Sequence, residues 1–176
     1  MIASSPSFLV FRFFHIVAGV LWVGSAFLFS GFIGPSATEV GPAAGPLVAV
    51  LVKKRKITKV IVSLSGVTVL AGWILWLKDL SNYGSLGDWL GTSFGLVLTI
   101  GAVLATIAMG IGARLIGPNV EKVVDLGGQI AAGGGPPTPE QAAEMERTQT
   151  TLEMSSKIDL VLLLLAVTAM ATARYW

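Results

Sequence analysis

The residue in this sequence with the clearest capacity for chemistry is His15, the single histidine among 176 residues. It follows Arg12 in the chain, and Gly19 and Trp22 come after it at helical spacing within a long apolar stretch. A helix would place all of these side chains on one face. Ionisable groups inside a membrane are costly and usually face the interior of a helix bundle, which makes His15 the first candidate for a functional site.

A neutral imidazole is a ligand for haem iron and for copper. In such a site Gly19, one turn from His15, would leave room for a flat macrocycle against the helix, and Trp22 would form a packing wall. The first hypothesis is therefore a b-type haem bound through His15, serving electron transfer or haem handling. An alternative hypothesis is copper handling by the same imidazole.

A second ligand from the same chain must be another type of residue, because the sequence has no further histidine and no cysteine. Met170 is the candidate. It precedes Arg174 by one helical turn, much as His15 follows Arg12, so both side chains would lie at a similar depth near one face of the membrane. A homodimer that brings two His15 side chains to one haem is the other arrangement that would complete the coordination.

The same residues also allow a purely structural interpretation. His15 would then hydrogen-bond a neighbouring Ser or Thr, Arg12 would extend to lipid phosphate, and Met170 would only fill space. Asp159 has two interpretations as well. It is either a proton or cation group in the membrane, or a carboxylate at a helix start that pairs with Lys157 or caps backbone amides.

Several classes of site are missing from the sequence. It contains no glycine-rich phosphate loop, no HExxH metal motif and no nucleophile elbow. The absence of cysteine excludes thiolate catalysis and cysteine-ligated clusters, and the charge pattern shows no nucleic-acid signature. A third hypothesis is therefore a non-catalytic accessory or assembly subunit of a membrane complex. Small residues at four-residue spacing, such as Gly101 and Ala105, favour close helix contacts of that kind.

The elements that must position these residues follow from the composition. Hydrophobic residues make up 53% of the chain and charged residues 12%, about half the charged share of a soluble domain. A bilayer core needs about 20 apolar residues in a helix. The sequence predicts an all-α, transmembrane four-helix bundle that forms one domain over residues 1–176. Its spans are expected at about 8–34, 57–78, 89–116 and 156–175, with a cytoplasmic segment at 118–155.

The basic residues predict how this bundle is oriented. The loop between the first two spans is rich in lysine and arginine, whereas the next loop holds only Lys78 beside two aspartates. By the positive-inside rule the first loop is cytoplasmic and both termini lie outside, in a bacterial inner membrane. An outer belt of aromatic residues is expected to agree with this orientation: Trp73, Trp76, Trp89, Tyr175 and Trp176. The N-terminus lacks the basic region of a signal peptide, so the first span is expected to be retained.

Two short motifs suggest internal organisation. Residues 33–36 read Ile-Gly-Pro-Ser and residues 116–119 read Ile-Gly-Pro-Asn, each at the predicted end of a span. They indicate two repeated helical hairpins, or else a helix stop of convenient chemistry that arose twice. In the cytoplasmic segment a helix is expected from Pro118, followed by a flexible Gly-Gly-Gly-Pro-Pro break. Thr138 and Gln141 then form a capping box that opens a helix running toward the fourth span.

Residues 14–24 (FHIVAGVLWVG) resemble the first-helix motif His-x3-Gly-x2-Trp-x-Gly of small bacterial membrane proteins related to the copper resistance D family. They are similar also to uncharacterised four-helix integral membrane proteins and, more distantly, to the four-helix membrane protoporphyrinogen oxidase. The ending at residues 169–175 (AMATARY) resembles the tail of the uncharacterised group. The resemblance covers both ends of the chain and implies a haem b or copper role for His15.

The sequence departs from the oxidase pattern in the third span. Members of that group have a lysine early in the third helix, after a tryptophan, whereas residues 90–94 after Trp89 read Leu-Gly-Thr-Ser-Phe. Lys78 ends the second span and does not match that position. The resemblance therefore does not extend to porphyrinogen oxidation. A copper relay also lacks its usual side chains, because the chain has 5 methionines and a single histidine.

Overall fold

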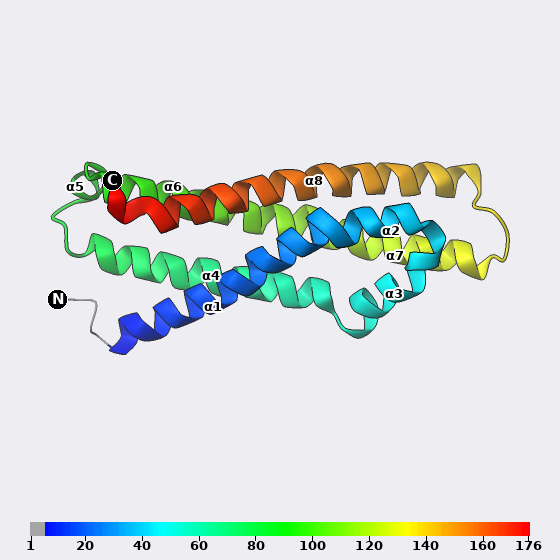
Figure 1. Ribbon diagram of the computed structural model, residues 1–176, viewed down its shortest axis with the longest axis horizontal. Helices are drawn as coiled ribbons and strands as arrows, with labels where there is room; N and C mark the ends of the chain where they lie inside the picture. The colour runs from blue at the N-terminus through cyan, green and yellow to red at the C-terminus, as the bar shows by residue number, and fades with distance from the viewer. Residues whose placement is uncertain (1–5) are drawn as a thin grey trace. The chain divides into compact units, whose positions relative to one another are not determined.

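The computed structural model describes residues 6–176, which are helical nearly throughout and contain no strand (Figure 1). Four helices in this part are long and apolar enough to cross a membrane, which confirms the predicted all-α fold class. They are built on α1 (Pro6–Leu28), α4 (Ile57–Leu80), α6 (Ser93–Ile111) and α8 (Pro139–Thr172). Shorter elements join them: α2 (Gly34–Val40), α3 (Gly45–Ala49), α5 (Leu86–Leu90) and α7 (Gly117–Ala132).

The chain divides into two compact units. The first unit contains Met1–Gly24, Ser63–Met109 and Val161–Trp176, and therefore holds one part of each long helix. The second unit contains Ser25–Val62 and Gly110–Leu160, with α2, α3 and α7 in it. His15 and its predicted partners Arg12, Gly19, Trp22 and Met170 all belong to the first unit.

Helix α4 is joined to α6 in the first unit by two hydrogen bonds in an apolar setting. The indole of Trp73 donates to Thr106 Oγ1 at 3.0 Å, and that of Trp76 donates to Thr99 Oγ1 at 2.8 Å. Helix α6 in turn approaches α8 closely at Gly101, where a β-carbon would lie 3.0 Å from Cγ of Met170. The predicted use of small residues for close helix packing is confirmed at this position.

An aromatic cluster closes one end of the first unit. Trp89 has no exposed surface, and its ring packs edge-on against Trp76, Tyr83 and Phe94, with centroid separations of 6.2, 4.9 and 5.6 Å. The sequence analysis expects the third span from about residue 89, whereas the third long helix begins later. Trp89 lies on the separate helix α5, and α6 begins at Ser93 after a break. Of the expected aromatic belt, Tyr175 and Trp176 are exposed, whereas Trp76 and Trp89 are core residues.

The predicted helix stops at the two Ile-Gly-Pro motifs are also wrong. A wider π-helical turn, η1 (Phe29–Ile33), precedes the first motif, and the chain continues directly into α2. The second motif is preceded in the same way by η4 (Gly112–Ile116) and continues into α7. Proline lacks the N–H of a regular helix and its ring clashes with the carbonyl four residues earlier. A wider turn with i→i−5 bonds accommodates it without ending the helix.

The glycines of the two motifs occupy matching places. The N–H of Gly34 donates to the carbonyl of Phe29, and the N–H of Gly117 donates to the carbonyl of Gly112. A β-carbon on Gly34 would lie 2.9 Å from the Phe29 oxygen, so this wide turn requires a glycine. The similarity of the two hairpins thus extends from three letters of sequence to a shared irregular turn.

The segment between the third and fourth spans folds largely as the sequence predicts. Helix α7 matches the expected helix, and the capping box is present: Thr138 N donates to Gln141 Oε1 at 3.0 Å, and Gln141 N donates to Thr138 Oγ1 at 3.3 Å. Helix α8 then runs without interruption from Pro139. The expectation that Asp159 lies at a helix start is therefore wrong, and Lys157 pairs with Glu153, at 2.6 Å, instead of with Asp159.

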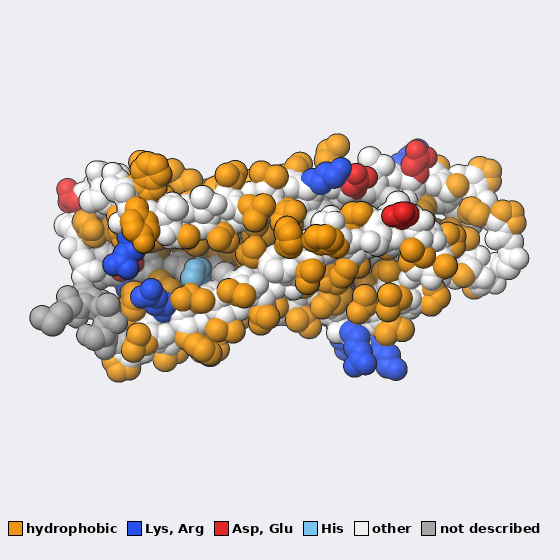
Figure 2. All heavy atoms as spheres, viewed as in Figure 1, with side chains coloured by type: hydrophobic (Ala, Val, Ile, Leu, Met, Phe, Trp, Pro, Cys, Tyr) orange, Lys and Arg blue, Asp and Glu red, His pale blue; other side chains and the backbone are white. Residues whose placement is uncertain are grey.

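The outer surface of these helices is apolar. Figure 2 shows hydrophobic side chains over most of the visible face, with charged groups gathered in a few places. Only 11% of the most apolar window of the first long helix is buried inside the protein, and side chains such as Phe13 and Val20 are more than half exposed. Lipid is the solvent that such a surface requires, so the chain is membrane-like in both sequence and structure.

Candidate functional site

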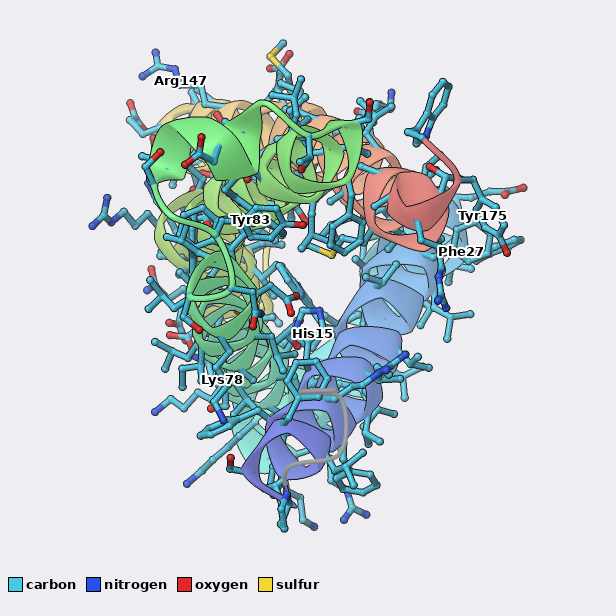
Figure 3. All side chains as sticks on the ribbon, turned by 90° about the vertical axis from the view of Figure 1, so that its left-hand side faces the viewer. His15, Phe27, Lys78, Tyr83, Arg147 and Tyr175 are labelled. Atoms are coloured by element: carbon cyan, nitrogen blue, oxygen red, sulfur yellow. The ribbon has the colours of Figure 1, made fainter. Side chains whose placement is uncertain are left out.

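The candidate site is centred on His15, which lies between α1 and α4 in the first unit (Figure 3). The imidazole Nδ1 is 2.8 Å from the backbone carbonyl oxygen of Thr68 on α4. The side chain is half-buried, and Figure 2 shows the pale-blue histidine at the floor of a recess in the apolar face. The predicted hydrogen bond to a Ser or Thr is thus formed, but to the backbone of Thr68 instead of its hydroxyl.

This contact fixes the proton of the neutral imidazole. A carbonyl oxygen can only accept a hydrogen bond, so Nδ1 must be the protonated nitrogen. Nε2 then carries a lone pair, and within residues 6–176 the structure gives it no hydrogen-bond partner. Metal-bound histidines commonly donate the other ring N–H to a backbone carbonyl or carboxylate in this way, which sets the ring orientation and raises the basicity of the ligating nitrogen.

Gly72 forms the surface on which the imidazole rests. A β-carbon at this residue would lie 2.8 Å from Cε1 and 2.9 Å from Nδ1 of His15, but 3.8 Å from Nε2. The ring therefore lies against the backbone of α4, with Nε2 as the nitrogen farther from that helix. Because any side chain at residue 72 would collide with the ring, the glycine is a condition for this histidine position.

The hydroxyl of Thr68 is occupied elsewhere. It donates to the carbonyl of Leu64 at 2.8 Å, within α4. The side chain is 6% exposed, and its methyl group faces α1, where a β-carbon on Gly19 would lie 3.3 Å from it. In the structure Gly19 thus permits the close approach of α1 and α4 at the turn next to His15. Trp22, one turn further, is 3% exposed and packs inside the unit.

Charged residues surround the end of this site nearest the chain start. Arg12 is exposed, and its positive charge acts on the carboxylate of Asp79 on α4. Lys78 bridges the same two helices: Nζ donates to Ser7 Oγ at 2.7 Å and lies 5.4 Å from the ring centre of Phe11. These groups would pair well with anionic substituents at the edge of a bound molecule.

Met170 lies on α8, in the same unit as His15. Its Cγ lies against Gly101 of α6, and the side chain is half-buried. The role of Met170 as a second ligand stays a prediction from the sequence.

Metal chemistry at the site is limited by its donors. Residues 6–176 contain no group of three or more His, Cys, Asp or Glu side chains arranged to hold a metal ion. A haem brings the in-plane nitrogens itself and needs only axial ligands from protein. One histidine with a fixed tautomer and an available Nε2 fits that requirement better than it fits a free copper ion.

Thr68 and Gly72 are the members of the site that sequence reasoning assigned only to helix packing. Both belong to a series of small and hydroxyl residues in the second span, which do not point to His15 by type or spacing. Their relation to the histidine depends on which face of α4 meets α1. The comparisons with models of protein families, with curated proteins and with solved structures gave no match.

Proposed function

We propose that this protein is an integral protein of the bacterial inner membrane that binds a b-type haem through Nε2 of His15. The observation that carries the proposal is the Nδ1 contact with the Thr68 carbonyl, which leaves Nε2 as the free ligand nitrogen. Bound haem would supply a one-electron redox centre, consistent with electron transfer or haem handling. The resemblance of residues 14–24 to copper resistance D-related proteins supports the same assignment.

The orientation belongs to the same proposal. The cluster of basic residues between α1 and α4, at residues 53–59, favours a cytoplasmic position for that loop. Both termini would then lie outside, and His15 would lie in the half of the membrane nearer the outer face. Reactivity of cysteines introduced at Ser81 and at Lys56 toward a membrane-impermeant thiol reagent in intact cells tests this orientation. Labelling at residue 56 but not at residue 81 would contradict it.

The test of haem binding is an absorption spectrum of the detergent-purified protein after expression with added haem precursor. We expect a Soret band and reducible α and β bands in the wild type. His15→Ala should lose them. His15→Asn is the sharper variant, because the amide can still donate to the Thr68 carbonyl in place of Nδ1 but offers no counterpart of Nε2.

The outcomes separate ligation from packing. Loss of the Soret band in both variants, with His15→Asn folded by circular dichroism and gel filtration, supports ligation. A wild-type protein without a Soret band after haem supplementation contradicts the proposal. The haem-free wild type could instead bind copper in a stoichiometric amount and lose it in His15→Asn. That result would show that the ligand of this imidazole is copper and not haem.

A further inference from the structure

A second site lies on α8, independent of the haem proposal. The buried residues of this helix are Thr148, Ser155, Asp159, Leu163 and Ala166. Asp159 is 4% exposed and is the one acidic residue among the buried polar side chains of the described chain. It lies within the segment that the sequence assigns to the membrane, far from either end of the helix.

One carboxyl oxygen of Asp159, Oδ1, is buried without a hydrogen-bond partner. Ser155, one turn away on the same face, already donates its hydroxyl to the carbonyl of Thr151 at 2.7 Å. The nearest charged residues on α8, Glu153 and Lys157, pair with each other and are 68% and 72% exposed.

Within residues 6–176, the other helices also provide no ion-pair partner for the Asp159 carboxyl. The remaining ion pairs join Lys53 to Asp125 and Lys122 to Glu144, both on the surface. None of the ion pairs within residues 6–176 includes Asp159. A buried carboxylate that lacks a hydrogen-bond donor and a paired cation is strongly disfavoured relative to its protonated form.

We propose that Asp159 is a proton-binding site in the membrane, which holds its proton until water or a cation reaches the carboxyl group. The ligand is a single proton on a carboxyl oxygen. Ionisation would release it into the interior of the bundle, as in proton-carrying membrane proteins. This inference stands whether or not His15 binds haem, because it uses none of the residues of that site.

The experiment uses the full chain in native membranes and the apolar reagent dicyclohexylcarbodiimide. A protonated carboxyl adds across one C=N bond of this reagent: the carboxyl oxygen bonds to the central carbon, its proton moves to nitrogen, and no atom leaves. An ionised carboxylate has no proton to transfer. We expect one adduct per chain by intact mass, placed at Asp159 by peptide mass spectrometry, with a yield that falls as the pH is raised.

Two variants and one competing ion complete the design. Asp159→Asn should lose the adduct, and Glu153→Gln, on the exposed face of the same helix, should keep it. Even if Asp159→Asn failed to fold, the position of the adduct in the wild type would decide. No adduct, or an adduct at another acid, would overturn the proposal. So would protection by sodium chloride but not by choline chloride at constant pH, because it would identify an alkali-cation site.

Discussion

The imidazole of His15 rests on the backbone of Gly72, with Nδ1 2.9 Å from the place where a β-carbon on that glycine would lie. Two helices therefore cooperate in one ring position. Helix α1 carries the histidine, and α4 provides both the flat surface and the carbonyl acceptor one turn before it. The properties of the histidine consequently depend on a residue that has no side chain.

Gly72→Ala should displace the imidazole and break its hydrogen bond to Thr68. Overpacking of this kind costs about 1–3 kcal/mol in a close-packed interior. We expect a lower unfolding temperature in detergent and, if haem binds, a reduced and shifted Soret band. Gly66→Ala on the same helix is the matched control, because no atom lies within 4 Å of its would-be β-carbon. Equal stability of the two variants would show that the contact between residues 15 and 72 is absent in the membrane.

Gly95→Ala should disturb the aromatic cluster. A β-carbon at this residue would collide with the carbonyl oxygen of Trp89 and would lie 2.7 Å from its ring, and neither atom belongs to a flexible group. We expect a red-shifted tryptophan emission and a loss of stability at the upper end of the 1–3 kcal/mol range for overpacking. Gly110→Ala, also on α6 but in open space, should leave the emission unchanged. The prediction fails if both variants have the wild-type spectrum.

Thr138→Ala should weaken the start of α8 without affecting the membrane part. The capping box holds one backbone N–H through each of its two side chains, and loss of such a cap costs about 1 kcal/mol. Hydrogen exchange should therefore become faster at the first amides of α8, near Gln141, and remain unchanged near Leu163. Thr150→Ala, on the same helix outside the cap, serves as the control. Unchanged exchange at the helix start would contradict a cap at Thr138.

The exposed pair of Lys122 and Glu144 ties α7 to α8 and makes their contact dependent on pH. The hydrogen bond from Lys122 lowers the pKa of the Glu144 carboxyl below its ordinary value of 4.5. A lowered pKa in the folded state means that the pair stabilises the contact above pH 4.5 and that this effect is lost as the pH falls through the lowered value. Lys122→Gln should return the pKa of Glu144 toward 4.5, as measured by carboxyl NMR titration. If Glu144 had the same titration curve in the wild type and in Lys122→Gln, the pair between Lys122 and Glu144 would be excluded.

The sequence was sufficient for those features that depend on neighbours along the chain. Apolar length predicts the four membrane helices, and the capping box at Thr138 predicts the start of α8, because both rest on local chemistry. The Ile-Gly-Pro motifs were misleading for a reason that is also local. Proline ends a regular helix, but a wide turn before it removes the conflict, and no residue type announces such a turn.

Features that depend on contacts between helices could be predicted only in part. The lone histidine and its face on α1 follow from helical spacing. That Gly72 supports the imidazole, and that Thr68 accepts through its backbone, requires knowledge of which face of α4 meets α1. Asp159 shows the same limit, since its isolation depends on α8 beginning at Pro139 and on Lys157 turning to Glu153.

The two wide turns at Phe29–Ile33 and Gly112–Ile116 change which residues face inward in the long helices that contain them. One surplus residue in a turn advances every later side chain by about 100° around the axis. The stripe that faces inward before the turn is therefore not the stripe that faces inward after it. Each long helix can therefore place its apolar residues on one side before the turn and on another side after it, according to which helices it packs against. Deleting a single amino acid within either turn would undo that rotation for everything downstream.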